Sequence, residues 1–332
     1  MAAEPSELRP ARVRVPASTS NLGSGFDCLG LAIARYLEAA YEPGDAPLRL
    51  ELGGTLAALG TTAEDDILAR AFRARAAAHG VPSAGGVLRA TSDIPLSRGL
   101  GSSAAAVVAG LALADAAAGK LKHAANPDAP GHSPVHALAP AQQDEWLAAA
   151  TELEGHPDNA APAILGGLVA VARDTAGRPR AVPLPLSPAV GFAFAAPGAE
   201  VSTRAARRAL PAEVPHAVAA RALGRLAALL HGLAVADPEL IRSGFADELH
   251  VPYRLPLIPG AREAMEAAYA AGAWAVTISG SGSGLIAACA PTRAADVAAA
   301  MADAFRRAAG PEGVVHFEAR PAIQGVRVEL EP

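Results

Sequence analysis

Residues 99–103, Gly-Leu-Gly-Ser-Ser, combine two glycines and two hydroxyl side chains where a strand-like segment gives way to an alanine-rich helix. Glycines let backbone amides approach an anion closely, and the start of a helix offers unpaired N–H groups with partial positive charge. The hydroxyls of Ser102 and Ser103 suit phosphate oxygens or a magnesium ion. No lysine follows the glycines, so this is not a Walker P-loop. An ordinary turn capped by Ser102 is the alternative, but the strand before it and the companion segments favour a phosphate site.

A second polar segment, residues 16–30, concentrates short hydrogen-bonding side chains and glycines in a predicted loop after strand 12–15. Asn21 and Asp27 suit a polyol or amino-acid substrate, because both can bind a hydroxyl and Asp27 can also pair with an ammonium group. A capped turn, in which these side chains satisfy backbone groups, is an equally open interpretation.

A third segment, residues 152–159, gathers carboxylates, a histidine and an asparagine. Magnesium prefers hard oxygen ligands and usually takes one or two carboxylates beside phosphate. We expect Glu154 to be the ligand, with Glu152 either solvated or the ligand in its place. Asp158 and Asn159 could instead cap the next segment.

The Gly/Ser stretch 278–284 superficially resembles a dinucleotide fingerprint. A strand rather than a long helix is predicted to follow it, so a Rossmann assignment is poor. A tight loop whose backbone lines a ligand cavity fits better.

Strand-like and helix-like segments alternate along the chain, which predicts an α/β or α+β architecture. Residues 120–141 interrupt this pattern with prolines, and His123, His132 and His136 there are interpreted as solvated loop histidines. A domain boundary is expected near 185–200. The expected strands are 12–15, 48–52, 87–91, 164–171, 190–195, 275–279, 285–289 and 313–319, and the expected helices 65–78, 102–119, 142–153, 215–234, 260–271 and 294–308.

Composition excludes several classes of protein. The chain has 332 residues, 51% of them hydrophobic, and a net charge of −5 without a basic stripe, which argues against nucleic-acid binding. Cys28 and Cys289 suggest buried free thiols rather than a disulfide or zinc site. The N-terminus does not resemble a signal peptide, and Gly, Asp or Arg interrupts the apolar stretches before 18 residues. We therefore expect no membrane partner and a cytoplasmic location.

The order of segments 95–105 and 279–284 resembles the galactokinase/homoserine kinase/mevalonate kinase/phosphomevalonate kinase (GHMP) superfamily over nearly the whole chain. Within it the chain is most similar to the homoserine kinases, which phosphorylate the side-chain hydroxyl of L-homoserine on the route to threonine. The resemblance implies an α+β fold, with a ribosomal-S5-like N-terminal ATP-binding domain at 1–190 and a ferredoxin-like C-terminal domain at 191–332. It also implies an active site between them and a homodimer. The more specific motifs are residues 16–30, His156-x-Asp158-Asn159-x-Ala161-Pro162 and Gly166-Gly167.

The same resemblance implies roles for individual residues. Magnesium would be held by Ser103 and Glu154. Arg207 and Arg254 would hold the carboxylate of homoserine, a task that suits the forked guanidinium, although Arg207 has Arg204 and Arg208 beside it and could be surface charge. Asn21, Asp27, His156, Asn159 and Thr203 would surround the rest of the substrate. ATP would bind Pro95, Leu96, Ser97, Arg98, Gly99, Leu100, Gly101, Ser102, Ser103, Ala104 and Ala105.

Phosphoryl transfer needs mainly alignment and neutralised charge. Related kinases use an aspartate as base, which makes Asp158 the formal candidate; our hypothesis is that no base acts and that Asn159 orients the hydroxyl, aided by Asp27. Asp66 stands where relatives often carry an asparagine near adenine, so the adenine contacts stay open. The alternatives are a sister kinase for another alcohol, such as mevalonate or a sugar, a non-catalytic ligand sensor, and a nucleotide-dependent oxidoreductase.

Overall fold

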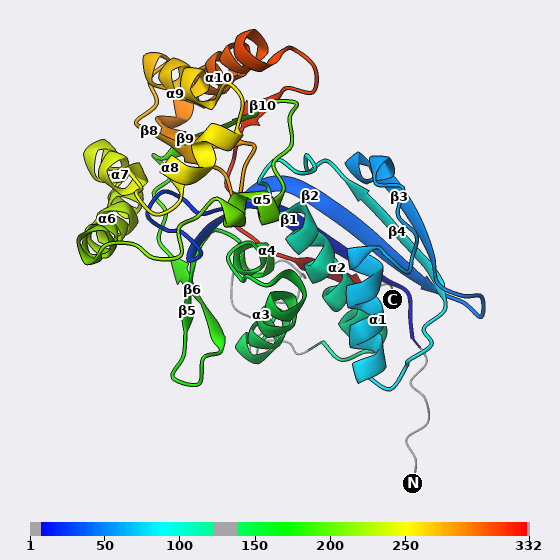
Figure 1. The fold of residues 1–332 in the computed structure, drawn as a ribbon. Helices are drawn as coiled ribbons and strands as arrows, with labels where there is room; N and C mark the ends of the chain where they lie inside the picture. Colours follow the sequence, from blue (N-terminus) through cyan, green and yellow to red (C-terminus); the bar gives the residue numbers. More distant parts are fainter. Residues whose placement is uncertain (1–7, 122–137, 331–332) are drawn as a thin grey trace.

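Two β-sheets and the helices that cover them make up the computed structural model, which describes residues 8–121 and 138–330 (Figure 1). The predicted insertion 120–141, with its three histidines, lies mostly outside the described residues. The strands are β1 Ala11–Ser20, β2 Leu29–Pro43, β3 Arg49–Gly54, β4 Gly86–Ser92, β5 Leu168–Arg173, β6 Pro179–Leu184, β7 Gly191–Ala196, β8 Ala275–Ile278, β9 Leu285–Cys289, β10 Val315–Glu318 and β11 Arg327–Leu330. The helices are η1 Thr55–Ala58, α1 Ile67–Ala78, α2 Ser102–Ala117, α3 Pro140–Glu154, α4 Ala160–Leu165, α5 Thr203–Arg208, α6 His216–Val235, α7 Pro238–Phe245, α8 Val251–Arg254, η2 Leu255–Leu257, α9 Ala261–Ala270, η3 Pro291–Arg293 and α10 Ala294–Ala309.

The first sheet has the order β11-β1-β2-β4-β3, with β5 and β6 joined to it through β2. Its pairings are antiparallel except that of β3 with β4. The second sheet is antiparallel with the order β10-β7-β9-β8, and α9 and α10 pack beside it, which is a ferredoxin-like arrangement. The predicted α+β class is confirmed. The division at residue 190 stays a prediction: β7 opens the second sheet at Gly191, while β11 returns to pair with β1 in the first.

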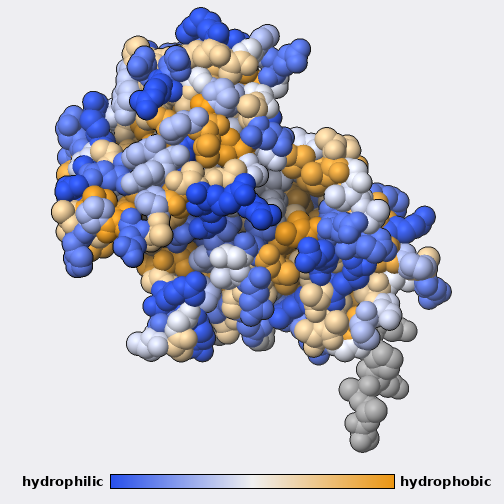
Figure 2. Space-filling model, viewed as in Figure 1, coloured by the Kyte–Doolittle hydropathy of each residue, from blue (hydrophilic) through white to orange (hydrophobic). Residues whose placement is uncertain are grey.

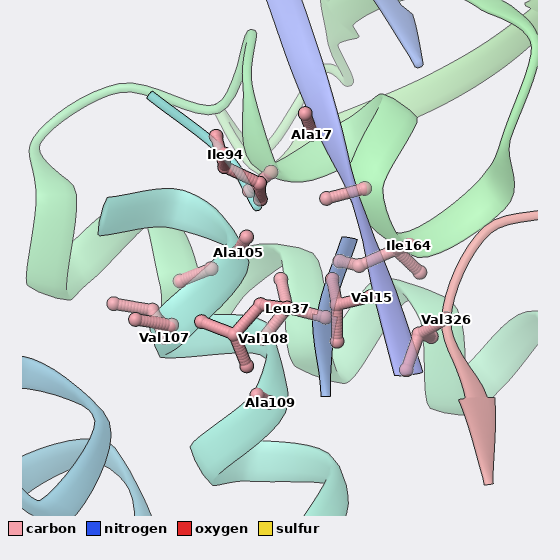
Figure 3. Packing of buried hydrophobic residues seen from close by; sticks show 14 of the residues in the cluster. Val15, Ala17, Leu37, Ile94, Ala105, Val107, Val108, Ala109, Ile164 and Val326 are labelled. Carbon is pink, nitrogen blue, oxygen red and sulfur yellow. The ribbon is translucent and has the colours of Figure 1, made fainter. Parts of the chain in front are cut away.

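Helix α2 is the centre of the first layer, and Ala104–Ala117 are all buried in it. Its small side chains let neighbouring elements approach: a Cβ on Gly110 would stand 2.4 Å from the Leu68 carbonyl oxygen of α1. Figure 3 shows Val15 of β1, Leu37 of β2 and Val108 of α2 meeting in this core. The alanine-rich stretch therefore brings the start of α2 close to the end of β1.

Asp115, fully buried in α2, is the polar hub of the helical layer. Its carboxylate accepts hydrogen bonds from Arg75 (2.6 and 2.9 Å), His79 (2.5 Å), Gln142 (2.7 Å) and Trp146 (2.7 Å). Burial by itself would raise the pKa of Asp115, but the bonds from Arg75, His79 and Trp146 outweigh it, and the pKa lies below its ordinary value. One ionised carboxylate thus joins α1, α2 and α3.

One helix bears on the expectation that Gly, Asp or Arg interrupts each apolar stretch before 18 residues. By length and composition, α6 is apolar enough to cross a bilayer, although Arg221 and Arg225 lie within it. Both arginines pair with Glu248, and the helix packs against α7. A single such helix within the described part of the chain is weak evidence for a membrane span.

The largest error in the predicted elements concerns residues 16–43. The segment predicted as a loop from residue 16 is strand as far as Ser20, because a register shift between Pro16 and Ala17 lets β1 continue past the proline. The fifteen-residue β2 was not predicted. The predicted strand 164–171 instead begins as the end of α4 and becomes β5 only at Leu168.

We expect Asp115→Asn to destabilise the protein by about 3 kcal/mol at pH 7, because it leaves the Arg75 cation unpaired and turns an amide N–H toward buried donors. The lowered pKa means that the carboxylate contributes stability above its ordinary value of 3.8 and loses it as pH falls through the lower folded value. Urea unfolding of both proteins at pH 7 measures the difference.

The matched control is Asp144→Asn, which removes an exposed ion pair with Arg180 and should cost less than about 1 kcal/mol. Equal losses from the two substitutions would contradict the role assigned to Asp115.

Candidate active site

The site lies in a cleft of about 650 Å³ at the junction of the two sheets. Figure 2 shows hydrophilic residues gathered over α5 at the centre of the molecular face. Ala104 and Ala105 are buried behind this cleft, and Asp27 reaches it through Arg207. Most of the residues predicted from the sequence line it: Asn21, Pro95, Leu96, Ser97, Arg98, Gly99, Leu100, Gly101, Ser102, Ser103, Glu154, His156, Asp158, Asn159, Thr203, Arg207 and Arg254.

The turn before α2 has the left-handed backbone that its glycines allow, with φ of 76° at Gly99 and 61° at Gly101. Gly101, not Ser102, is the N-cap residue of α2, and no side chain caps the helix. The first amides of α2 are therefore left for a ligand. The turn rests on the glycine- and serine-rich loop 279–284, whose Ser279 hydroxyl donates to the Gly99 carbonyl oxygen at 2.7 Å.

Ser103, in the first turn of α2, faces Glu154 at the last residue of α3. The serine hydroxyl donates to a Glu154 carboxylate oxygen at 2.7 Å, whereas Glu152 is exposed and does not line the cleft. In the described ranges no three His, Cys, Asp or Glu side chains form a metal cluster. This pair of hard oxygen donors beside a phosphate-type turn fits magnesium shared with a nucleotide better than a metal held by protein alone.

The partly buried His156 and the buried Asp158 form a dyad that lines the cleft. The His156 Nδ1 lies 2.7 Å from the Asp158 carboxylate, which also accepts the Asn159 backbone N–H at 3.1 Å. The bond to Asp158 raises the pKa of His156. Burial alone would raise the pKa of Asp158, but His156, Ser20 and Arg207 outweigh it and lower that pKa. Asp158 is thus held as an ionised carboxylate.

Asn159 stands at the N-cap position of α4, but its side chain makes no capping bond. Instead its amide accepts from Ser18 at 3.0 Å and donates to Ser20 at 2.9 Å. A Cβ on Gly101 would lie 2.9 Å from its Oδ1, so the amide sits directly beneath the phosphate turn. The two serines, which the sequence analysis left without a role, position this amide from β1.

Asn21 fixes the loop after β1. Its Oδ1 accepts the Asp27 backbone N–H at 2.8 Å and its Nδ2 donates to the Gly280 carbonyl at 3.0 Å, so both ends of the amide satisfy backbone. The structure thus gives it the turn-forming role that was left open, although it also lines the cleft. Asp27 accepts two hydrogen bonds of 3.0 Å from Arg207 of α5, and this bond raises the pKa of Arg207.

Arg254 is a buried cation, 1% exposed, at the end of α8. Its guanidinium donates to the carbonyl oxygens of Ala206 (3.3 Å) and Gly280 (3.4 Å), and among the described residues no carboxylate forms an ion pair with it. Burial, together with the charge of Arg207, lowers the pKa of Arg254. A buried guanidinium in this setting is suited to an anionic ligand.

Two aromatic rings behind the site were missed from the sequence. The buried His250 stacks on Phe26 with ring centroids 5.2 Å apart, and Arg254 lies over the same ring at 5.0 Å. Burial lowers the pKa of His250 to about 4, so the imidazole is neutral at pH 7. Nothing in the local sequence signals this contact, since more than two hundred residues separate the rings.

The other end of the cleft is apolar, lined by Leu56, Leu59 and Leu96. Asp66 borders it but acts as the N-cap of α1, where its carboxylate accepts from the backbone N–H groups of Leu68 and Ala69. An apolar wall beside a phosphate turn suits the flat ring of a nucleotide base.

A glycine turn with uncapped helix-start amides that shares one cleft with the guanidinium groups of Arg207 and Arg254, in this pair of sheets, is the arrangement expected of a small-molecule kinase of the GHMP type. Residues 66–126 match the family "GHMP kinases N terminal domain" and residues 217–307 match "GHMP kinases C terminal". The chain belongs to the homoserine kinase family, as the following similarities show.

The chain is 43% identical to the homoserine kinase of Moorella thermoacetica, covering 89% of this chain and 92% of that one. It is 40% identical to the homoserine kinase of Thermus thermophilus, covering 91% and 93%. A crystal structure of homoserine kinase from Cytophaga hutchinsonii superposes with a TM-score of 0.78 at 26% identity, covering 99% of both chains. A mevalonate kinase from L. major, 13% identical with a TM-score of 0.66 over 93% and 95%, shares the fold. The predicted family and fold are confirmed.

We expect Gly99→Ala to weaken ATP binding at least tenfold. The added Cβ would stand 1.9 Å from the Ser279 carbonyl oxygen, at a φ of 76° that L-residues avoid, so the phosphate turn must move. Equilibrium titration with a fluorescent ATP analogue measures the change in Kd.

Gly119→Ala is the matched control, since its φ of 63° is equally strained but nothing lies within 4 Å of the added carbon. It should lower stability by about 1 kcal/mol and leave the Kd within twofold. A Gly99→Ala protein that binds the analogue as tightly as the control would refute the phosphate role.

Proposed function

We propose that this protein transfers the γ-phosphoryl group of ATP to the side-chain hydroxyl of L-homoserine, giving O-phospho-L-homoserine for threonine biosynthesis. The observation that carries the proposal is one cleft lined both by the glycine turn of residues 99–103 and by the guanidinium groups of Arg207 and Arg254, with Asp27 bonded to Arg207 beside it. The similarity to homoserine kinases over about nine-tenths of the chain supports it.

The charges suit an amino-acid zwitterion. Asp27 would receive the ammonium group, while Arg207 and Arg254 would receive the carboxylate. Without substrate, Asp27 and Arg207 neutralise each other through a two-bonded pair. A zwitterion replaces that pair with two new ones, whereas a ligand with a single charge leaves one partner unpaired. Thr203, whose hydroxyl lies 3.2 Å from that of Ser281, and His156 would complete the acceptor pocket.

ATP would lie along residues 95–105, with its base at the apolar end of the cleft. The amides that begin α2 would bind its phosphates. Ser103 and Glu154 would hold magnesium, which when bound neutralises phosphate charge. Their short contact in the protein makes Glu154 the preferred ligand over the exposed Glu152.

Transfer would proceed by alignment rather than by strong base catalysis. The hydroxyl oxygen bonds to the γ-phosphorus as the bond from that phosphorus to ADP breaks. The loose transition state needs little prior loss of the hydroxyl proton, which then passes to an oxygen of the transferred phosphoryl group. Asn159 would orient the hydroxyl from beneath the phosphate turn. Asp158 is a poor base because its lowered pKa gives its carboxylate little affinity for a proton.

The alternatives fit less well. An enzyme for mevalonate or a sugar has no ammonium group to place against Asp27. A ligand sensor has no need of both the open turn and the Ser103–Glu154 pair. The loop 279–284 supports the turn through residue 99 and is followed by β9, which argues against a dinucleotide site.

A cytoplasmic homodimer without a nucleic-acid or membrane partner forms part of the proposal. The net charge of −5 and the small-molecule cleft support independence from nucleic acid. The dimer rests on the family resemblance.

Coupled ADP release with magnesium and ATP tests the function on homoserine, threonine, serine, mevalonate and 4-hydroxybutyrate. We expect homoserine to give the highest kcat/KM by at least a hundredfold. In Asp27→Asn, kcat/KM for homoserine should fall about a hundredfold. For 4-hydroxybutyrate, which lacks the ammonium group, kcat/KM should stay the same or rise, because the substitution frees Arg207. The absence of homoserine turnover would end the proposal.

Asp158→Asn tests the role of the dyad. A true general base contributes roughly 10²–10⁴ to the rate. We expect kcat to fall less than about a hundredfold, because the amide still accepts from His156 while Asn159 orients the hydroxyl. Loss of turnover with unchanged homoserine binding by calorimetry would instead make Asp158 the base.

A further inference from the structure

Arg98 lies within the phosphate segment, but its side chain extends to the other sheet. Its Nη2 donates to the carbonyl oxygen of Gly198, in the loop after β7, at 2.8 Å. The side chain is only 11% exposed, and its nearest acidic partner, Glu200, lies at 3.4 Å and is 62% exposed. Its Nη1 also donates to the carbonyl oxygen of the neighbouring Ser97 at 3.4 Å. The shortest hydrogen bond of this largely buried cation is therefore to a carbonyl oxygen from a different part of the fold.

The phosphate turn does not need this side chain to keep its own shape. The Arg98 carbonyl accepts the Gly284 N–H at 3.2 Å, and the Gly99 carbonyl accepts the Ser279 hydroxyl at 2.7 Å. Both bonds run from the loop 279–284 to the backbone of the turn. The guanidinium adds a third link, to a different loop.

That loop leads directly into the acceptor pocket. The backbone at Glu312 packs directly against Gly198, since a Cβ on Gly198 would stand 2.1 Å from the Glu312 carbonyl oxygen. Four residues later, Ser202 caps α5 by accepting the Ala205 N–H at 3.1 Å. The first residue of α5 is Thr203, and its fifth is Arg207, which holds Asp27.

We propose that Arg98 is a positioning residue that sets the spacing between the phosphate turn and α5, and so aligns the acceptor hydroxyl with the γ-phosphate. The effect of Arg98 on the alignment of the hydroxyl rests on the proposed function, whereas its effect on the spacing between the turn and α5 does not. Arg98 acts through Gly198 and α5, not by touching the acceptor. Because the turn keeps its two other links, loss of the Arg98 side chain impairs the use of homoserine more than the binding of ATP.

The test compares Arg98→Met, which keeps the aliphatic stem but removes the donors, with Arg98→Lys, which can still reach a carbonyl oxygen. Glu200→Gln is the matched control, because it removes the exposed carboxylate and leaves the Gly198 bond. For each protein, KM for homoserine, KM for ATP and kcat are measured. Amide hydrogen exchange of residues 199–208 is followed in the protein without ligands.

For Arg98→Met we expect kcat/KM for homoserine to fall about tenfold, KM for ATP to change less than twofold, and exchange of residues 199–208 to quicken severalfold. Arg98→Lys should recover at least half of the loss in kcat/KM for homoserine on a logarithmic scale. Glu200→Gln should have the kinetic constants and the exchange rates of the parent protein. A rise in KM for ATP alone would overturn the proposal and make Arg98 a phosphate ligand. Unchanged exchange in Arg98→Met would overturn it as well. Quickened exchange in a protein that does not turn over homoserine would support the link while refuting the proposed function.

Discussion

The active-site cleft depends on a backbone contact between two glycine-rich segments from different sheets. Gly99 lies so close to Ser279 that a single added carbon would stand 1.9 Å from its carbonyl oxygen, and the Ser279 hydroxyl satisfies the Gly99 carbonyl. The Thr19 hydroxyl, at the end of β1, lies 2.8 Å from the same serine. Because backbone meets backbone here, the turn before α2 is fixed relative to both sheets, and its amides stay directed at one place in the cleft.

The charged side chains at the cleft differ in how fully the protein pairs them. The buried carboxylate of Asp158 is balanced by His156 and by nearby hydrogen bonds, which lower its pKa and keep it ionised. Arg254 donates to two carbonyl oxygens and lies over the ring of Phe26, whereas Arg207 shares its charge with Asp27 through two direct hydrogen bonds. These are the charges that the proposed zwitterionic substrate would pair. The helical layer behind the cleft keeps its own charges satisfied around Asp115.

Much of the site could be predicted from the sequence because its motifs are local. The turn 99–103, the Glu154 to Asn159 segment and the second glycine-rich loop each carry their chemistry within a few residues, and all of them reach the cleft. What could not be predicted is which of two roles a polar side chain takes. Asn21 and Asp66 satisfy backbone groups, whereas Ser18 and Ser20 hold Asn159, because in each case the partner is set by the packing of distant segments.

The sequence by itself determined the family resemblance and, through it, the α+β class, and it located the glycine turn before α2, since these depend on residue types at short spacing. The tertiary structure decided that β1 continues past Pro16, that β2 forms the long centre of the first sheet, and that the last strand returns to β1. It also decided the partners of the cleft's arginines: Arg207 meets Asp27, Arg254 stays without a carboxylate among the described residues, and Arg98 reaches Gly198. A charged side chain takes its partner from whatever the fold brings within about 4 Å, and here the fold joins Arg207 to Asp27 and Arg98 to Gly198, which are 180 and 100 positions apart.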